Sequence, residues 1–184
     1  MDSFFVDGTL YQGRPADESA RLPRERETYD LLEQLGIAFC RADHDAADTI
    51  ADCEEIDRIL GVRMCKNLFL SNRQGTQFYL LLLPGEKPFV TKDFARALGI
   101  ARTSFADAAH MREYLGVDPG AVTVLGLMHD GEHNVHLVID RAVLAGECIG
   151  CHPCVNTSSV RISVADLVGK FLPHTGHAPT LVDL

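Results

Sequence analysis

The sequence predicts an α+β fold in a single domain, residues 1–184. Its 184 residues suit one domain of ordinary size, and a composition of 46% hydrophobic and 23% charged residues is typical of soluble globular chains. Helix-like and strand-like segments are mixed along the chain, and no apolar run approaches the ~20 residues that cross a membrane. The strand pairs expected within 62–83 and 122–139 lack the helix-sized spacing of a βαβ unit, which favours a mixed or largely antiparallel sheet.

The first elements are two helices with a short strand between them. Leucines recur at near-helical spacing over residues 23–35, and Gly36 supplies a C-terminal stop. Residues 37–40 are a strand candidate. Thr49 is expected to cap a second helix that ends at Leu60.

The middle of the chain predicts a pair of strands followed by two helices. Residues 62–70 and 78–83 flank a polar turn and are expected to pair antiparallel. Because 78–83 is apolar throughout, it is expected at the centre of the sheet with both faces covered. Thr91 is predicted to cap a third helix, and Asp107 to cap a fourth over 108–115.

The last third predicts further strands and a final helix. Residues 122–128 and 135–139 are expected to be strands joined by a polar loop, and 148–155 another extended segment. Ser163 opens a helix towards the C-terminus, and 180–182 is a candidate closing strand.

The formal charge of −9 is unevenly distributed. Residues 1–57 carry a net −10, residues 58–102 a net +6, and residues 103–184 a net −5. A basic middle on an acidic chain can bind a phosphate-bearing ligand with a small footprint. The alternative is a solvated basic face, since clustering in sequence does not establish clustering in space.

Three thiols and an imidazole stand close together as Cys148, Cys151, His152 and Cys154. They suggest either a zinc or iron–sulfur site or buried thiols. On an extended strand, Cys148 and Cys154 would lie about 20 Å apart, which favours buried thiols unless Pro153 makes a turn. The six cysteines, with no basic and apolar secretory signal at the N-terminus, predict reduced thiols in the cytoplasm.

Other nucleophile and ligand motifs are weak. His129, His133 and His136 surround a polar loop, and nothing in their spacing makes them converge on a metal. The sequence has no phosphate-cradling glycine loop and no Gly-x-Ser-x-Gly elbow, which disfavours a covalent hydrolase.

The most informative position is Lys66, followed by Asn67 inside an apolar strand candidate. An ammonium in a cleft is costly unless it is paired or bound to an anion. Lys66 therefore either lies on the solvent face of the strand or anchors a phosphate or carbonyl group.

Five short motifs follow one another along the chain: Lys66-Asn67-Leu68-Phe69-Leu70, Ser104-Phe105-Ala106, Pro119-Gly120-Ala121-Val122-Thr123, His152-Pro153 with Asn156-Thr157, and Thr175-Gly176-His177. Over about residues 22 to 184 they resemble, in order and spacing, the YbaK/ProX family of prolyl-tRNA editing proteins, and in detail its PrdX-like branch. The resemblance implies a curved, mixed and partly barrel-like sheet wrapped by helices, with residues 1–21 as an N-terminal extension.

The resemblance implies hydrolysis of a mischarged aminoacyl-tRNA, typically alanyl-tRNA(Pro), without a cofactor or a metal. The implied partner is the acceptor end of the tRNA, with prolyl-tRNA synthetase as a second candidate and with neither DNA nor a membrane. The essential lysine of the family matches Lys66 as the catalytic residue. The expected substrate-binding residues are Asn67, Gly120, Ala121, Val122, Val124, His152 and Asn156. The basic residues expected on the tRNA are Arg63, Arg73, Lys87 and Lys92.

Three positions depart from the pattern of the family. Val124 replaces the proline of its Gly-x-x-x-Pro loop, Cys151 an aromatic residue, and Ser71 a second lysine. These changes affect loop rigidity, pocket size and contact with the acceptor stem. The resemblance therefore indicates the reaction class rather than the amino acid that is removed.

An aminoacyl ester is already activated, so a positioned water and a charge on the carbonyl oxygen suffice for hydrolysis. We expect Lys66 to anchor the terminal phosphate or to polarise the ester. Backbone N–H groups of 120–122 are candidates to hold the ester or the α-amino group, and a ribose hydroxyl to orient the water. His152 is a structural wall, a substrate contact or a general base. The competing classes are a non-catalytic tRNA- or synthetase-binding module and a cysteine-based metal or thiol protein.

Overall fold

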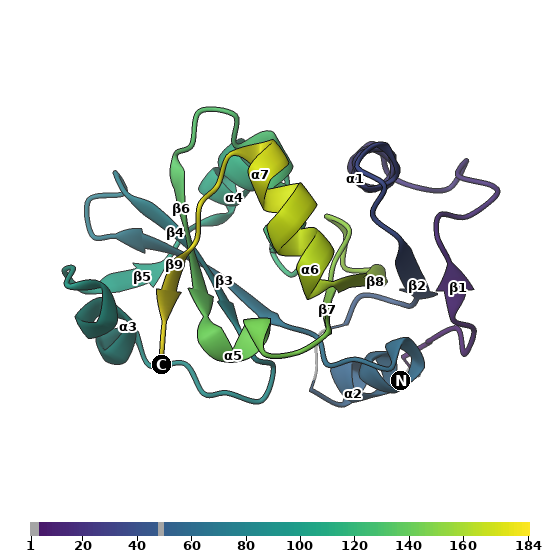
Figure 1. The fold of residues 1–184 in the computed structure, drawn as a ribbon, viewed down its shortest axis with the longest axis horizontal. Helices are drawn as coiled ribbons and strands as arrows, with labels where there is room; N and C mark the ends of the chain where they lie inside the picture. The colour runs from purple at the N-terminus through teal and green to yellow at the C-terminus, as the bar shows by residue number, and fades with distance from the viewer. Residues whose placement is uncertain (1–3, 48–49) are drawn as a thin grey trace.

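The computed structural model describes residues 4–47 and 50–184, whose strands form two sheets (Figure 1). The larger sheet has the order β5(Thr103–Phe105), β3(Lys66–Asn72), β4(Phe78–Leu83), β6(Val135–Asp140), β9(Thr180–Val182). The smaller sheet has the order β1(Tyr11–Gln12), β2(Phe39–Asp43), β8(Ser158–Ser163), β7(Cys148–Cys151). The α+β class predicted from the sequence is confirmed.

Strand β4 lies at the centre of the larger sheet, as predicted. It pairs antiparallel with β3 and parallel with β6, so this sheet is mixed. Every residue of β4 is buried. Phe78, Leu80 and Leu82 enter the main core, while Tyr79 and the leucines on the other face pack with Phe94 of the following helix. Cover on both faces explains why the strand is apolar throughout.

Helical segments connect the strands of the two sheets. They are α1(Pro23–Gln34), α2(Ile50–Leu60), α3(Thr91–Leu98), α4(Ala108–Leu115), the 3-10 helix η1(Val124–His129), α5(Arg141–Leu144), α6(Val164–Asp166), the π-helix η2(Leu167–Phe171) and α7(Leu172–Thr175). Among the described residues, no helix is long and apolar enough to cross a membrane.

Two of the predicted caps are confirmed. The Asp107 carboxylate accepts from the His110 N–H, and the Ser163 hydroxyl accepts from the Asp166 N–H. Thr91 was predicted as a cap but is the first residue of α3, preceded by Val90 without a side-chain bond. The predicted cap Thr49 lies outside the described residues.

The strand predicted over 122–128 is wrong, because η1 occupies this segment. The Thr123 hydroxyl caps η1 by accepting from the Leu125 N–H at 3.3 Å. Gly126 packs so closely on α4 that a Cβ would lie 2.8 Å from the Leu115 carbonyl oxygen. A short apolar run that is buried all round has no period to separate helix from strand.

Other strand boundaries shift. The strand predicted over 37–40 runs over Phe39–Asp43, and the one predicted over 62–70 begins at Lys66. The extended segment predicted over 148–155 ends at Cys151, because the chain turns and Cys154 has a φ of 62°.

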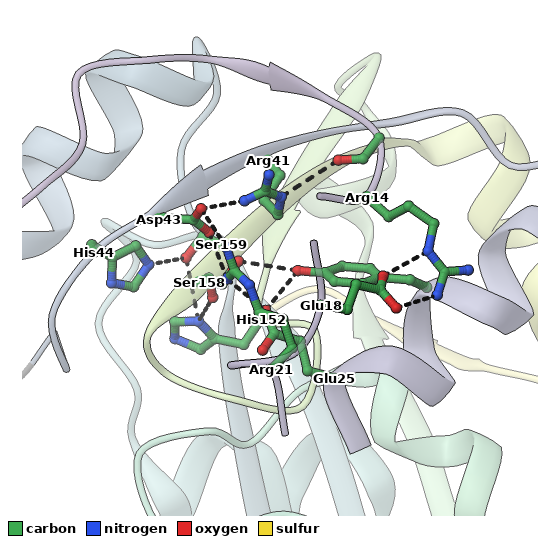
Figure 2. Close-up of polar contacts among 12 residues, drawn as sticks. Arg14, Glu18, Arg21, Glu25, Arg41, Asp43, His44, His152, Ser158 and Ser159 are labelled. Atoms are coloured by element: carbon green, nitrogen blue, oxygen red, sulfur yellow. Dashed lines mark hydrogen bonds and ion pairs between the residues drawn. The ribbon is translucent and has the colours of Figure 1, made fainter. Parts of the chain in front are cut away.

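Residues 4–21 are built into the smaller sheet. Strand β1 pairs with β2, and Val6 bridges His44. The Arg21 guanidinium lies 2.6 Å from the Asp43 carboxylate and 3.0 Å from the buried Glu25 carboxylate (Figure 2). The segment predicted as an extension therefore adds a strand and a buried ion-pair cluster to the fold.

The two sheets meet where Met64, just before β3, bridges Gly150 of β7. The Cys65 N–H donates to the Gly150 carbonyl at 2.9 Å. A Cβ on Gly150 would lie 2.9 Å from the Met64 sulfur and 3.2 Å from the Met64 Cα, so a larger residue here would require Met64 to shift. The main core runs across the junction and contains Phe39 of the smaller sheet and Phe69 of the larger.

Candidate active site

A pocket of ≈ 470 Å³ opens at the junction of the two sheets. Lys66 and Gly85 line it from the larger sheet, and His152 lines it from the end of β7. Ile56 and Asp57 of α2 form another wall. The pocket therefore brings together the predicted catalytic lysine and the predicted pocket histidine, which lie far apart in the sequence.

Lys66 is half-buried at the start of β3, opposite Leu83 in the register with β4. Its Nζ donates to the Lys87 carbonyl oxygen at 2.7 Å. An ammonium carries three donors, and the described residues supply a partner for one of them. The other two are available to a ligand in the pocket, so the solvent-face alternative for Lys66 does not describe its position.

His152 presents a neutral ring to the pocket. Its Nδ1 lies 3.0 Å from the Ser158 carbonyl oxygen, which only accepts, so Nδ1 carries the proton. Burial is the main cause that lowers the pKa of His152 to about 4. At neutral pH the ring therefore leaves the lone pair of Nε2 as an acceptor, and no other described residue bonds that atom.

A chain of hydrogen bonds extends behind His152 (Figure 2). The Ser159 hydroxyl lies 3.3 Å from His152 Nδ1 and 2.9 Å from His44 Nε2. His44 Nδ1 lies 2.7 Å from the Asp45 carbonyl oxygen and so donates to it. His44 Nε2 is then an acceptor for the Ser159 proton, and burial lowers the pKa of His44. In this chain both His152 and His44 are protonated on Nδ1.

The thiols that line the pocket, Cys53 and Cys65, are neutral. Burial raises the pKa of Cys65 to about 12 and also raises that of Cys53. Burial likewise raises the pKa of Cys151 and Cys154, which do not line the pocket. Buried thiols of this kind are poor nucleophiles. Within the described ranges, no group of three or more His, Cys, Asp or Glu side chains is arranged to hold a metal ion.

Asn67 and the predicted loop residues Ala121 and Val124 do not line the pocket. Asn67 Oδ1 accepts from the Val124 N–H at 2.8 Å, and its Nδ2 donates to the Cys65 carbonyl at 3.0 Å. Val124 and Ala121 are buried in the core. The loop thus braces β3 through Asn67.

Gly120, Val122 and Asn156 are also absent from the pocket lining. Gly120 has a φ of 89°, and a Cβ there would lie 3.0 Å from the Asn156 amide nitrogen. This close approach joins the loop after α4 to the turn between β7 and β8. A direct contact of these residues with substrate stays a prediction.

The predicted tRNA contacts are dispersed. Arg63 lies at the pocket and faces Glu86 at 3.6 Å, with both side chains exposed. Arg73 and Lys92 are exposed, and Arg73 follows the far end of β3, about 20 Å from Lys66 at the rise of a strand. Lys87 is paired with a buried carboxylate and is not a free surface cation.

Asp57 is a pocket residue that sequence reasoning missed. Its Oδ1 accepts from the Met64 N–H at 2.7 Å, and burial raises its pKa. The missed signal is its place beside Cys53, Ile56 and Leu60, which recur at helical spacing on the apolar stripe of α2. An acid at the edge of such a stripe indicates a cleft or a buried hydrogen bond.

Residues 44–170 match the aminoacyl-tRNA editing domain. The chain belongs to this family. The editing domain hydrolyses the ester of an aminoacyl-tRNA, so the predicted YbaK/ProX resemblance and the predicted reaction class, a deacylase acting on aminoacyl-tRNA, are confirmed. The substrate class of the family is the aminoacyl-tRNA itself.

Two relatives and one solved structure are similar to this chain in sequence or in fold. The chain is 31% identical over 136 residues to the prolyl-tRNA editing protein ProX of Acetoanaerobium sticklandii, and the alignment covers 74% of this chain and 83% of that protein. It is 30% identical over 160 residues to prolyl-tRNA synthetase associated domain-containing protein 1 of Danio rerio, covering 85% of each. The crystal structure of a candidate trans-editing enzyme for prolyl-tRNA synthetase superposes with a TM-score of 0.63 at 19% identity, covering 89% of this chain and 98% of that one. At this identity it supports the fold alone.

Proposed function

We propose that this editing domain removes alanine from alanyl-tRNA(Pro) and that hydrolysis takes place in the pocket between the two sheets. The observation that carries the proposal is the pairing of Lys66, with two donors available, and His152, with a free acceptor, in one pocket. The names of the relatives support prolyl-tRNA as the tRNA class.

In the proposed reaction, water attacks the ester without a side-chain nucleophile. The Lys66 ammonium binds the terminal phosphate or stabilises charge on the carbonyl oxygen. His152 Nε2 accepts a hydrogen bond from the water or from the α-ammonium group of the amino acid. Because its pKa is lowered to about 4, His152 is a weak base, and a ribose hydroxyl of the terminal adenosine is the better group to orient the water.

Selectivity in this scheme is steric. Ile56, Met64 and Cys65 contribute apolar wall to the pocket. The charged residues of the lining are Glu54, Asp57, Arg63, Lys66 and Glu86. A wall of this kind excludes side chains that are too large more effectively than it rejects small ones. We therefore expect alanine to be removed and the ring of proline to be excluded.

Few basic side chains surround the pocket on a chain of net charge −9. Affinity for the free tRNA is therefore expected to be modest, with a shallow dependence on salt. We propose prolyl-tRNA synthetase as the partner that delivers the tRNA, in the cytoplasm where aminoacyl-tRNA is made. The relatives whose names associate them with that synthetase support this choice.

The test is deacylation of a panel of aminoacyl-tRNAs by wild-type protein and by Lys66→Ala. We expect hydrolysis of alanyl-tRNA(Pro) with little hydrolysis of prolyl-tRNA(Pro), and a loss of at least ~10²-fold in Lys66→Ala. Lys170→Ala is the control, because Lys170 also donates to a backbone carbonyl but lies in η2, where its ammonium is paired with Asp166. Wild-type activity in a folded Lys66→Ala protein contradicts the proposal. Binding of tRNA without hydrolysis of any ester would instead indicate a non-catalytic module.

A further inference from the structure

We propose that Lys87 and Asp140 are positioning residues for Lys66, and that Lys87 acts through Lys66 and not by contact with the tRNA. The inference rests on the proposed role of Lys66 in the pocket. It replaces the expectation that Lys87 is a phosphate contact.

Lys87 touches Lys66 with its main chain and Asp140 with its side chain. The Lys87 carbonyl accepts from Lys66 Nζ at 2.7 Å, and Lys87 Nζ lies 2.7 Å from Asp140 Oδ2. The Asp140 side chain is 1% exposed, whereas that of Lys87 is 29% exposed. A bond of this kind to a buried carboxylate holds the residue whose carbonyl orients the catalytic ammonium.

The carboxylate of Asp140 is itself fixed. It accepts from the Ala142 N–H at 2.9 Å and from the Leu184 N–H at 3.0 Å. Burial works against ionisation, but the Lys87 ammonium and these two N–H groups lower the pKa of Asp140 below its ordinary value. The position of the Asp140 carboxylate is therefore set by β6 and the C-terminal residue, and not by the loop that carries Lys87.

The sheet explains why these residues meet. Strands β4 and β6 run parallel with Leu82 opposite Ile139, so their carboxyl ends lie side by side. The loop after β4 carries Lys87, and the last residue of β6 is Asp140. Lys66 begins β3 on the other flank of β4, opposite Leu83.

The same loop is constrained on its other side. A Cβ on Gly85 would lie 2.4 Å from the Met64 carbonyl oxygen, which shows how closely the loop approaches the segment before β3. The Lys87 N–H donates to the Pro84 carbonyl at 3.0 Å and closes a turn. Between the turn and the ion pair, the direction of the Lys87 carbonyl is fixed.

The two roles for Lys87 predict different kinetics. A phosphate contact contributes to binding, so its loss raises KM and reduces the dependence of KM on salt. The inference takes the second of the two proposed roles of Lys66, in which the ammonium stabilises the charge that develops on the ester. Loss of a residue that positions this ammonium then lowers kcat and leaves the salt dependence of KM unchanged.

The experiment compares Lys87→Met, Lys87→Arg and Lys170→Met in steady-state deacylation of alanyl-tRNA(Pro) at several salt concentrations. We expect Lys87→Met to lower kcat about 10-fold, the scale for residues that orient a reacting group. KM and its salt dependence should stay as in the wild type. Lys87→Arg keeps a cation for Asp140 and should recover most of the activity, while the control Lys170→Met should match the wild type.

A double-mutant cycle tests whether Lys87 acts through Lys66. In the Lys66→Ala background, Lys87→Met should cause no further loss, because the group that it orients is gone. An equal loss in both backgrounds, a rise in KM with a weaker salt dependence, or unchanged kinetics in Lys87→Met would each overturn the inference.

A second variant separates a loss of folding from a loss of positioning. Lys87→Met leaves a buried carboxylate without a cation, so a second variant combines it with Asp140→Asn and removes the unpaired charge. If both proteins fold by melting temperature and circular dichroism yet keep full kcat, the inference is wrong. Full activity in Lys66→Ala is a separate outcome that contradicts the proposed function itself.

Discussion

Acidification provides a direct test of the neutral state of the half-buried His152 ring. Its pKa is about 4 in the folded protein and near 6.5 in an unfolded chain. Between these values the unfolded state binds more protons, so the free energy of unfolding falls as the pH is lowered. The stabilisation is fully present above pH 6.5 and is lost as the pH falls towards 4.

The expected size follows from the two pKa values. Between pH 7.5 and 4.5, one group with this shift costs about 2 to 3 kcal/mol of unfolding free energy. His44 and His129, whose pKa values are also lowered by burial, act in the same direction. Asp57, with a raised pKa, acts in the opposite direction. A comparison with His152→Gln isolates the contribution of His152, because the other groups are common to both proteins.

The assay is urea unfolding of the wild type and His152→Gln at four pH values from 7.5 to 4.5. Glutamine keeps an N–H donor for the Ser158 carbonyl and does not titrate. The gap between the two proteins should narrow by about 2 to 3 kcal/mol as the pH falls. Parallel curves would show that His152 is not held as a buried neutral ring, and the argument for a free Nε2 acceptor would fail.

Three further substitutions test other parts of the structure. Gly85→Ala should lower kcat and lower the free energy of unfolding in urea by about 1–3 kcal/mol, because the new Cβ would lie 2.4 Å from the Met64 carbonyl oxygen. An unchanged kcat and unfolding free energy would refute this close approach. Arg21→Glu should cost at least about 2 kcal/mol, because it places a third carboxylate beside Asp43 and a buried glutamate, and equal urea midpoints would contradict that. Cys148→Ser should change the rate of deacylation by no more than a few-fold, and the purified wild-type protein should contain no stoichiometric zinc or iron. One equivalent of tightly bound zinc or iron that is lost in Cys148→Ser would favour a metal site.

Much of the fold could be predicted from local patterns of apolar and capping residues in the sequence. The apolar run of β4 predicted cover on both faces, and Asp107 before an apolar helix predicted its cap. The segment 122–128 failed because buried apolar residues without a period suit a 3-10 helix as well as a strand. The parallel pairing of β4 with β6 also escaped prediction, since it joins strands that are distant along the chain.

The candidate site was predictable only where short motifs in the sequence carry it. Lys66 and His152 were found through motifs, and the structure places both in one pocket. The ion pair of Lys87 with Asp140 was not predictable, because the two residues are 53 positions apart and are brought together by the parallel pairing of β4 with β6. Charge counts treat every lysine as free, whereas a buried carboxylate can bind one of them.

The seam between the two sheets carries a consequence for how this pocket can diversify. One sheet supplies the lysine and the other the histidine, while the bridge between Met64 and Gly150 sets the spacing of the two halves. A larger residue at position 150 would meet the Met64 sulfur and main chain, so the Met64 side chain or the segment before β3 would have to shift. If the proposed function holds, the width of the pocket between Lys66 and His152 depends on this contact as well as on the residues that line the pocket, so substitutions along the seam would change the size of the amino acid that fits while Lys66 and His152 stay the same.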